Sequence, residues 1–269
     1  RSSILWGIIL FILFFAVFQT NGRGSILSLC LGLIFIIVIN WKYTDKSSFI
    51  KVVIIVITAF LLANIESSNL TINRLSNQVS SGVSDPSVSV RLLIWQSAWD
   101  IIKTTPLLGT GIGTFAIIFP AFRKPALEEA VYFAHNDYLQ FWVETGFIRL
   151  SLMLFIMVTI SMMIKRILKH QRLIFRDRIE VSGLMAGLFT IGVHSFVDFN
   201  FYIIAILMII GFMCARIQEI SLKYFPKLVR VFIPAHKLSK NIFILISMAV
   251  PFVILSYSFP LGIADFYMN

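Results

Sequence analysis

The sequence predicts an all-α protein, a polytopic membrane helical bundle of about seven transmembrane helices, with one long outer loop that contains short amphipathic helices. Hydrophobic residues make up 58% of the chain and charged residues only 13%, whereas a soluble domain has about 25% charged residues. Apolar runs long enough to cross a bilayer as helices recur along the chain. The loops between them alternate in charge, which is typical of a multi-pass membrane protein.

The runs that predict spanning helices lie at 2–18, 24–40, 50–65, 147–164, 181–197 and 201–217, with a further run near 241–259. No small-residue cleavage site follows the first run, which favours a spanning helix over a signal peptide. Because the chain begins with Arg1 rather than Met, we expect it to be a segment of a longer protein that lacks N-terminal helices. Residues 1–269 are expected to form a single membrane domain.

The distribution of Lys and Arg assigns the two sides of the membrane. The loops 41–51, 165–180 and 216–240 are strongly basic, and their acidic residues are few: Asp45, Asp177, Glu180 and Glu219. Basic loops stay in the cytoplasm, so the segments 19–23, 66–146 and 198–200 are expected on the outer side. The net charge of +10 is therefore mostly a signal of topology, and a role in binding nucleic acid is not expected.

The large outer loop, residues 66–146, is the place for structure outside the bilayer. Its first part is rich in Ser and Asn and predicts no regular element. The segment that follows, RLLIWQSAWDIIKTTP, predicts an amphipathic helix suited to the bilayer interface. Its apolar face is expected to contain Leu92, Trp95, Trp99 and Ile102.

The glycine-rich stretch LLGTGIGTF, residues 107–115, follows this helix. It has neither a Lys-Ser/Thr ending nor a preceding strand, so a phosphate-binding loop is disfavoured. A turn after Pro106 that bends the chain back toward the membrane is the preferred interpretation.

The two cysteines, Cys30 and Cys214, both lie inside apolar runs. Free cysteine commonly packs in such surroundings. We therefore expect neither a disulfide nor a metal site from them.

A polar cluster stands just before the run 147–164, and it consists of His135, Asn136, Asp137, Gln140 and Glu144. Polar groups at a membrane entrance cost desolvation free energy unless water or a substrate satisfies them. His135 could be a structural residue that caps a helix, or a general base, because imidazole titrates near neutral pH and can accept a hydroxyl proton. Metal binding is less favoured, because no second ligand lies at zinc-like spacing.

Two arginines lie on the same predicted side as His135. Arg23 occupies a tight outer turn, and Arg91 opens the amphipathic helix. A guanidinium at the membrane is costly unless it faces a cavity or an anion, and two of them facing one cavity would suit a diphosphate. The alternatives are that Arg23 extends to the interface and that Arg91 is an ordinary solvated residue.

His194 and Asp198 lie in the stretch HSFVDFNF at the outer end of a predicted span. They are four residues apart on one helix face and can pair directly. The pair either fixes helix packing or contacts a substrate in the same outer cavity as His135.

Four motifs follow one another as TNGRGSIL, RLLIWQSAWDIIKTTPLLGTGIGTF, AHNDYLQFWVETGFI and HSFVDFNF. In this order they resemble the bacterial O-antigen ligase and O-antigen polymerase superfamily, which includes O-linked protein oligosaccharyltransferases. The resemblance covers most of residues 20–210. One departure is Arg149, where relatives commonly have glycine, which bears on helix packing there or on acceptor preference.

The resemblance implies a membrane glycosyltransferase of lipopolysaccharide or polysaccharide biosynthesis. Such enzymes take a glycan from an undecaprenyl-diphosphate carrier and join it to an acceptor hydroxyl on lipid A core, a polysaccharide or a protein. The implied location is the bacterial inner membrane, multi-pass, with the active site facing the periplasm, so that loop 66–146 is periplasmic. The family reaction is generally regarded as metal-independent, and neither a metal nor another cofactor is expected.

The resemblance also implies roles for individual residues. His135 matches the family's catalytic histidine, while Arg23 and Arg91 match the arginines that hold the carrier diphosphate. Supporting roles are expected for Asn136, Asp137, Glu144, His194 and Asp198, and Asp137 or Glu144 could orient His135.

Two other functions stay open from the sequence. A transporter or flippase for a lipid-linked saccharide would also need arginines facing an anion, although it would need charged residues along its spans. A non-catalytic membrane partner of a glycan-assembly complex would need no chemistry of its own.

Overall fold

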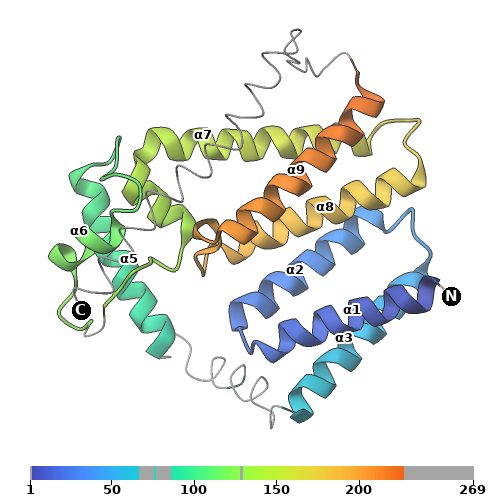
Figure 1. The fold of residues 1–269 in the computed structure, drawn as a ribbon, viewed down its shortest axis with the longest axis horizontal. Coiled ribbons are helices and arrows are strands. Elements are labelled where there is room, and N and C mark those ends of the chain that lie inside the picture. Colours follow the sequence, from blue (N-terminus) through green and yellow to red (C-terminus); the bar gives the residue numbers. More distant parts are fainter. Residues whose placement is uncertain (1, 67–75, 77–85, 128–129, 227–269) are drawn as a thin grey trace, which may run out of the picture. The chain divides into compact units, whose positions relative to one another are not determined.

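The computed structural model describes residues 2–66, 76, 86–127 and 130–226 (Figure 1). The chain divides into two compact units, Arg1–Tyr224 and Phe225–Asn269, and the fold given below is that of the first. The predicted span near 241–259 lies outside the described residues. The expectation of a single membrane domain stays a prediction.

The regular structure of the described residues is helical throughout, which confirms the all-α polytopic class. The elements, in chain order, are α1 Ser2–Gln19, α2 Arg23–Asn40, α3 Lys46–Glu66, α5 Pro86–Thr104, α6 Phe115–Phe122, α7 Asp137–Leu168, α8 Phe175–His194, the 3₁₀ turn η2 Asn200–Tyr202, and α9 Ile204–Tyr224. The long loop contains α5, which covers the segment predicted to be amphipathic, and α6, whose residues are all apolar.

Helices α2, α3, α7 and α9 are long and apolar enough to cross a membrane, and α1 contains a shorter apolar stretch, Ile4–Gln19. Only 11% to 22% of the residues in the four longer spans are buried inside the protein. Their apolar side chains therefore face outward, as the bilayer requires. The predicted run 181–197 falls on α8, but that helix begins at Phe175 and ends at His194.

Helices α2 and α8 pack antiparallel along their length. Phe35 stacks on Phe189 with ring centroids 4.4 Å apart, and the Asn40 amide donates to Ser182 Oγ at 2.8 Å. Gly32 has no side chain at the point of closest approach, where a Cβ would overlap Thr190. Small residues allow such close packing between membrane helices.

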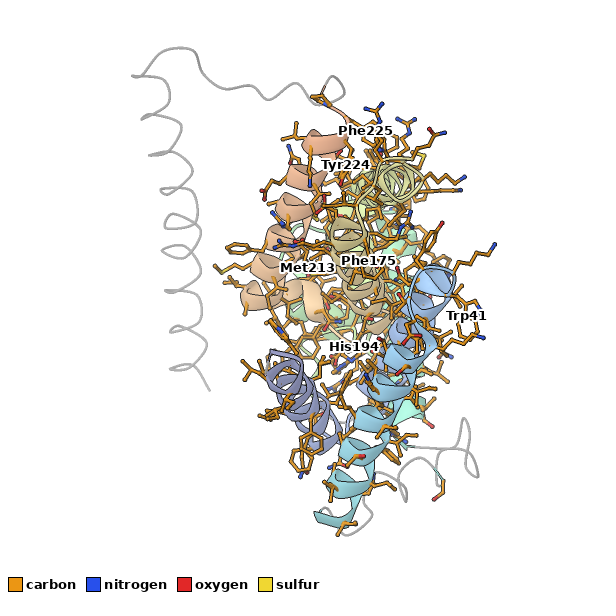
Figure 2. All side chains as sticks on the ribbon, turned by 90° about the vertical axis from the view of Figure 1, so that its right-hand side faces the viewer. Trp41, Phe175, His194, Met213, Tyr224 and Phe225 are labelled. Carbon is orange, nitrogen blue, oxygen red and sulfur yellow. The ribbon has the colours of Figure 1, made fainter. Side chains whose placement is uncertain are left out.

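The antiparallel packing of α2 and α8 creates two ends of the bundle. At one end, the start of α2 meets the end of α8, where Ser25 contacts His194. At the other end, the start of α8 meets the end of α9, where the Ile174 amide donates to Tyr224 Oη at 3.3 Å. Figure 1 shows the start of α8 and the end of α9 at the right of the view, and Figure 2, seen from that side, labels Tyr224 near the top and His194 below it. We call the first of these two ends of the bundle the His194 end and the second the Tyr224 end.

Helix α7 bends at Gly146, whose φ of 76° is left-handed. The kink frees backbone groups on both sides, and the glycine turn satisfies them: the Gly111 amide donates to Glu144 O at 2.8 Å, and the Phe147 amide donates to Pro106 O at 2.9 Å. A Cβ on Gly109 would collide with this backbone. Stretch 107–115 is thus bound to α7.

Arg149 belongs to the same junction. Its Nη1 donates to Leu108 O and Thr145 O, each at 3.3 Å. These carbonyls lie on the two segments that meet at the Gly146 kink. The guanidinium therefore ties the glycine turn to α7. Arg149 thus has a structural role that a glycine at this position could not have.

Helix α5 packs against α6 through a face that was not predicted from the sequence. Its fully buried residues include Ile94, Ala98 and Ile101, which pack with Phe115 and Phe119 of α6. Trp99, expected on the apolar face suited to the bilayer interface, is 46% exposed, whereas Ile102 of the same predicted face is 4% exposed. The segment is apolar on more than one face, so its pattern alone did not show which apolar residues pack against α6.

Candidate functional site

His135 lies directly before α7, and its backbone is held from two sides. The Ala134 amide donates to Gln140 Oε1 at 2.8 Å, and Ala134 O accepts from Trp95 Nε1 at 2.9 Å. Asn136 caps α7 by accepting from the Leu139 amide at 3.0 Å. With its neighbours fixed, His135 adopts a φ of 50°, an uncommon conformation for a residue with a side chain.

The imidazole of His135 faces Asp198. Its Nδ1 lies 3.9 Å from Asp198 Oδ1, which is beyond hydrogen-bond distance. This nitrogen is buried, and no hydrogen-bond partner for it is present among the described residues. The imidazole beside Asp198 lowers the pKa of that carboxyl below its ordinary value of 3.8. An ionised Asp198 therefore faces an imidazole that is about one-third exposed.

His194 joins the same carboxylate to α2. Its Nε2 lies 3.6 Å from Asp198 Oδ2 and 3.2 Å from Ser25 Oγ, while its Nδ1 lies 3.0 Å from Asn200 Oδ1. The predicted pairing of His194 with Asp198 is thus a loose one, and its closer partners are Asn200 and Ser25. Asp198 lies between two imidazoles from different segments.

Arg23 is placed two residues before Ser25, at the first position of α2. Its Nη2 donates to Ser87 Oγ at 2.5 Å, so it reaches the first turn of α5. Arg91 follows Ser87 by four residues and lies on the same face of α5, about 6 Å further along the axis. Both arginines therefore belong to the His194 end.

Arg91 is half-buried and makes no hydrogen bond or ion pair with any residue that the structure describes. Arg23, by contrast, is held by Ser87. The predicted pair of guanidinium groups thus consists of one that is positioned by a partner and one whose donors stay available to a ligand.

Glu144 is 1% exposed and lies at the centre of a hydrogen-bond network. Its carboxylate accepts from the Gly113 amide at 3.0 Å, from Gln140 Nε2 at 3.2 Å and from Tyr202 Oη at 3.0 Å. Burial raises the pKa of the Tyr202 hydroxyl, which keeps it a donor. Glu144 therefore binds the glycine turn and η2 to α7.

Asp137 is fully buried and has a similar role. Its amide donates to Ser195 O at 2.8 Å, and its Oδ2 accepts from the Phe201 amide at 3.1 Å. Neither Asp137 nor Glu144 hydrogen-bonds His135 among the described residues, contrary to the suggestion that one of them orients it. The carboxylate that faces the imidazole is Asp198.

Aromatic residues that the sequence did not single out surround the imidazole. Phe199 meets the His135 ring edge to face at 5.3 Å and stacks on Phe133 at 4.4 Å. Phe199 follows Asp198 in the motif HSFVDFNF, so the sequence already placed an aromatic ring next to this carboxylate. The partners Ser25 and Asn200 were also missed, although both stand inside quoted motifs.

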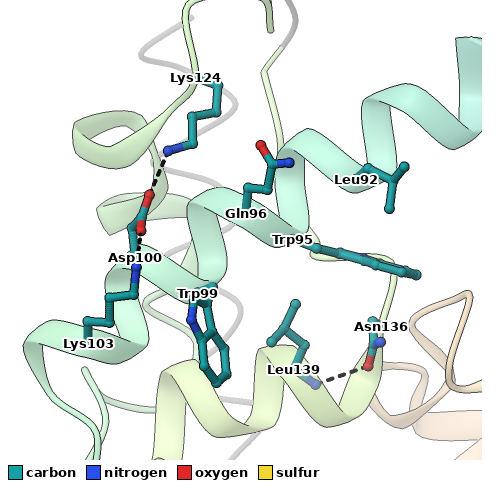
Figure 3. Close-up of a pocket in the computed structure, with 9 residues that line it drawn as sticks. All are labelled: Leu92, Trp95, Gln96, Trp99, Asp100, Lys103, Lys124, Asn136 and Leu139. Atoms are coloured by element: carbon teal, nitrogen blue, oxygen red, sulfur yellow. Dashed lines mark hydrogen bonds and ion pairs between the residues drawn. The ribbon is translucent and has the colours of Figure 1, made fainter.

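An open groove of about 610 Å³ lies along α5 (Figure 3). Its lining consists of Leu92, Trp95, Gln96, Trp99, Asp100, Lys103, Lys124, Asn136 and Leu139. Asn136 follows His135 in the chain, so one end of the groove lies at the segment that carries the imidazole, although His135 is not itself among the lining residues. In the described parts of the chain, no three His, Cys, Asp or Glu side chains are grouped to hold a metal ion.

The O-antigen ligase family model matches residues 8–154, more than half of the chain. The matched region contains Arg23, Arg91, His135 and Glu144, and it ends before His194. No curated protein matches the chain at a significant level. Together with the helical bundle and its membrane-spanning helices, the match shows that the chain belongs to the O-antigen ligase family.

Proposed function

We propose that this protein is a glycosyltransferase that moves a glycan from an undecaprenyl-diphosphate carrier to an acceptor hydroxyl on the periplasmic face of the bacterial inner membrane. The observation that carries the proposal is the partly exposed imidazole of His135 facing Asp198, at the bundle end that also contains Arg23. Membership of the O-antigen ligase family supports glycan transfer in general.

The carboxylate of Asp198 gives His135 a preferred tautomer. Because Nδ1 faces Asp198, the proton is favoured on Nδ1, and Nε2 then carries the lone pair. A base oriented in this way can accept a proton from a hydroxyl. Asp198 also stabilises the imidazolium that forms, as the carboxylate of a catalytic triad does.

The reaction is a displacement at the anomeric carbon of the carrier-linked sugar. The acceptor oxygen forms a bond to this carbon while its proton passes to His135. The bond from the anomeric carbon to the phosphate oxygen breaks, and its electron pair leaves with the diphosphate. Arg23 and Arg91 would stabilise the growing negative charge, an effect often worth about 3 kcal/mol for each well-placed donor.

The distribution of charge supports a periplasmic site. Basic residues are abundant in the connections at the Tyr224 end, in 41–51 and 165–180, and basic loops stay in the cytoplasm. The His194 end would then face the periplasm. Lipid A core, a polysaccharide and a protein all offer a suitable hydroxyl, and the acceptor is one of these.

A flippase and a non-catalytic partner are the alternatives. Helices α2 and α3 have charged residues only near their ends, whereas a flippase needs polar groups along the path of the headgroup. A non-catalytic partner has no need for an oriented imidazole. Both alternatives predict that transfer does not depend on His135.

Transfer in membranes that contain the lipid-linked donor tests the proposal. His135→Ala should lower the rate by about 100-fold or more, the usual contribution of a general base. His170→Ala is the matched control, because His170 lies at the Tyr224 end, where its ring packs at a tilt against Tyr224, and this variant should transfer normally. Equal rates in the two variants would refute the proposal.

A further inference from the structure

Helix α5 presents a second face that the rest of the described chain leaves open. Leu92, Gln96, Trp99 and Lys103 recur at three- and four-residue spacing and line the groove, whereas the buried core of α5 lies on the Ile94 face. The groove, at about 610 Å³, falls within the roughly 300–1,000 Å³ of ligand sites. This is space for a ligand, and its lining indicates which kind.

The two tryptophans in the groove are held in place. The Trp95 indole donates to Ala134 O at 2.9 Å, and Trp99 meets Trp142 edge to face at 5.4 Å. Trp99 nevertheless stays 46% exposed. Rigid indoles lose little conformational entropy when they bind a ligand. Sugar rings have apolar C–H faces that stack on such side chains.

The charges in the groove are already compensated. Asp100 accepts from Lys103 Nζ at 2.9 Å and from Lys124 Nζ at 2.6 Å (Figure 3). These lysines are therefore less available for a phosphate than unpaired lysines would be. Gln96 is exposed and makes no hydrogen bond with the described residues, so its amide can bind hydroxyls. The lining thus suits a polyhydroxyl ligand of low charge better than a diphosphate or a lipid headgroup.

We infer that this groove binds sugar rings of the transferred glycan or of the acceptor, next to the ring that reacts at His135. The inference rests on the proposed function, because it assumes a saccharide substrate. Asn136 lines the groove and follows His135 in the chain, so sugars bound next to the reacting ring would continue along α5 toward Lys103. The diphosphate would lie instead toward the first turn of α5, which Arg23 contacts.

The kinetic test compares Trp99→Ala with Trp41→Ala in the full chain. Trp41 is 57% exposed and stacks on Phe49 at 6.1 Å, so it matches Trp99 in chemistry but lies at the far end of α2. Trp99→Ala should raise KM about fivefold to tenfold with little change in kcat, and Trp41→Ala should change neither. The rise in KM for the donor or for the acceptor identifies which sugar chain is bound.

A binding measurement separates this inference from the proposed function. Intrinsic tryptophan fluorescence of the purified full chain is titrated with the oligosaccharide released from its carrier by mild acid, and separately with inorganic pyrophosphate. The oligosaccharide should bind, with at least about fivefold weaker affinity in Trp99→Ala and in Gln96→Leu. Normal oligosaccharide binding and a normal KM in both variants would overturn the inference that the groove binds sugar, even where His135→Ala abolishes transfer.

A loss of pyrophosphate binding in Trp99→Ala or Gln96→Leu would also overturn the inference, because the groove would then be an anion site. Trp99→Phe keeps an aromatic face and should retain most of the affinity. If His135→Ala transfers normally while the oligosaccharide still binds at Trp99, the proposed catalytic function fails and the sugar groove stands.

Discussion

The two ends of the bundle use similar side chains in different ways. At the Tyr224 end, Asp177 accepts from Lys223 Nζ and from Tyr224 Oη, both at 2.6 Å, and Arg216 makes two hydrogen bonds to Glu180. At the His194 end, Asp198 lies 3.6 Å and 3.9 Å from the nearest nitrogens of two imidazoles. The first end has close ion pairs between helices, while at the second Asp198 accepts from the Phe199 amide at 2.9 Å and lies at longer distances from both imidazoles.

This difference distinguishes charged groups that stabilise the packing of helices from charged groups that are available to a substrate. Close ion pairs bind α8 to α9 and leave little hydrogen-bonding capacity for a substrate. Loosely paired groups in a partly exposed site can change protonation or accept a new partner. The His194 end also contains the buried Glu144 and Asp137, which accept hydrogen bonds from neighbouring segments and hold these segments together.

Replacement of Glu144 should give the largest effect. Glu144→Ala removes the acceptor for the Gly113 amide, Gln140 and Tyr202, and buried donors without a partner should cost on the order of 3 kcal/mol or more. We expect a large loss of folded protein, measured by thermal unfolding in detergent. Glu180→Ala, at the other end, should cost at most about 1 kcal/mol because that pair is partly exposed. Equal losses would contradict the contrast between the two ends.

Asp198→Asn and Asp177→Asn should separate activity from stability. Asp198→Asn removes the charge that orients His135, so the transfer rate should fall at least about tenfold with a small change in melting temperature. Asp177→Asn should cost about 1 kcal/mol of stability and leave transfer intact. Both variants are assayed in the same membranes after correction for the amount of folded protein. A normal rate in Asp198→Asn would end its assignment as a positioning residue.

The helical class, and the grouping of the candidate residues' segments at one end of the bundle, were predictable because they depend on local properties. Apolar runs decide which segments enter the bilayer, and the basic loops decide which side each polar segment occupies. This reasoning alone assigned Arg23, Arg91, His135 and His194 to one side, and the structure brings their segments to one end of the bundle.

The contacts within the site were not predictable in the same way. Asp198 faces His135 across more than sixty residues of sequence, and only the packing of the turn after α8 against the start of α7 creates this contact. Asp137 and Glu144 were nearer in sequence, and both turned inward to satisfy backbone amides and a tyrosine. For α5, the run LLIW is apolar on several faces, so its period could not distinguish the core face from the groove.

The smallest predicted effect concerns acid stability. The imidazole of His135 lowers the pKa of Asp198 in the folded protein below 3.8, so folding favours the carboxylate. Asp198 therefore contributes stability above the unfolded pKa, and this contribution is lost as pH falls below 3.8 through the folded pKa. The difference in melting temperature between the parent and Asp198→Asn should shrink as the pH is lowered from about 5 to about 3. In a His135→Ala background the same comparison should show a weaker pH dependence, because the main cause of the shift is gone. A difference that is constant with pH, or that is unchanged by His135→Ala, would mean that the two side chains do not interact.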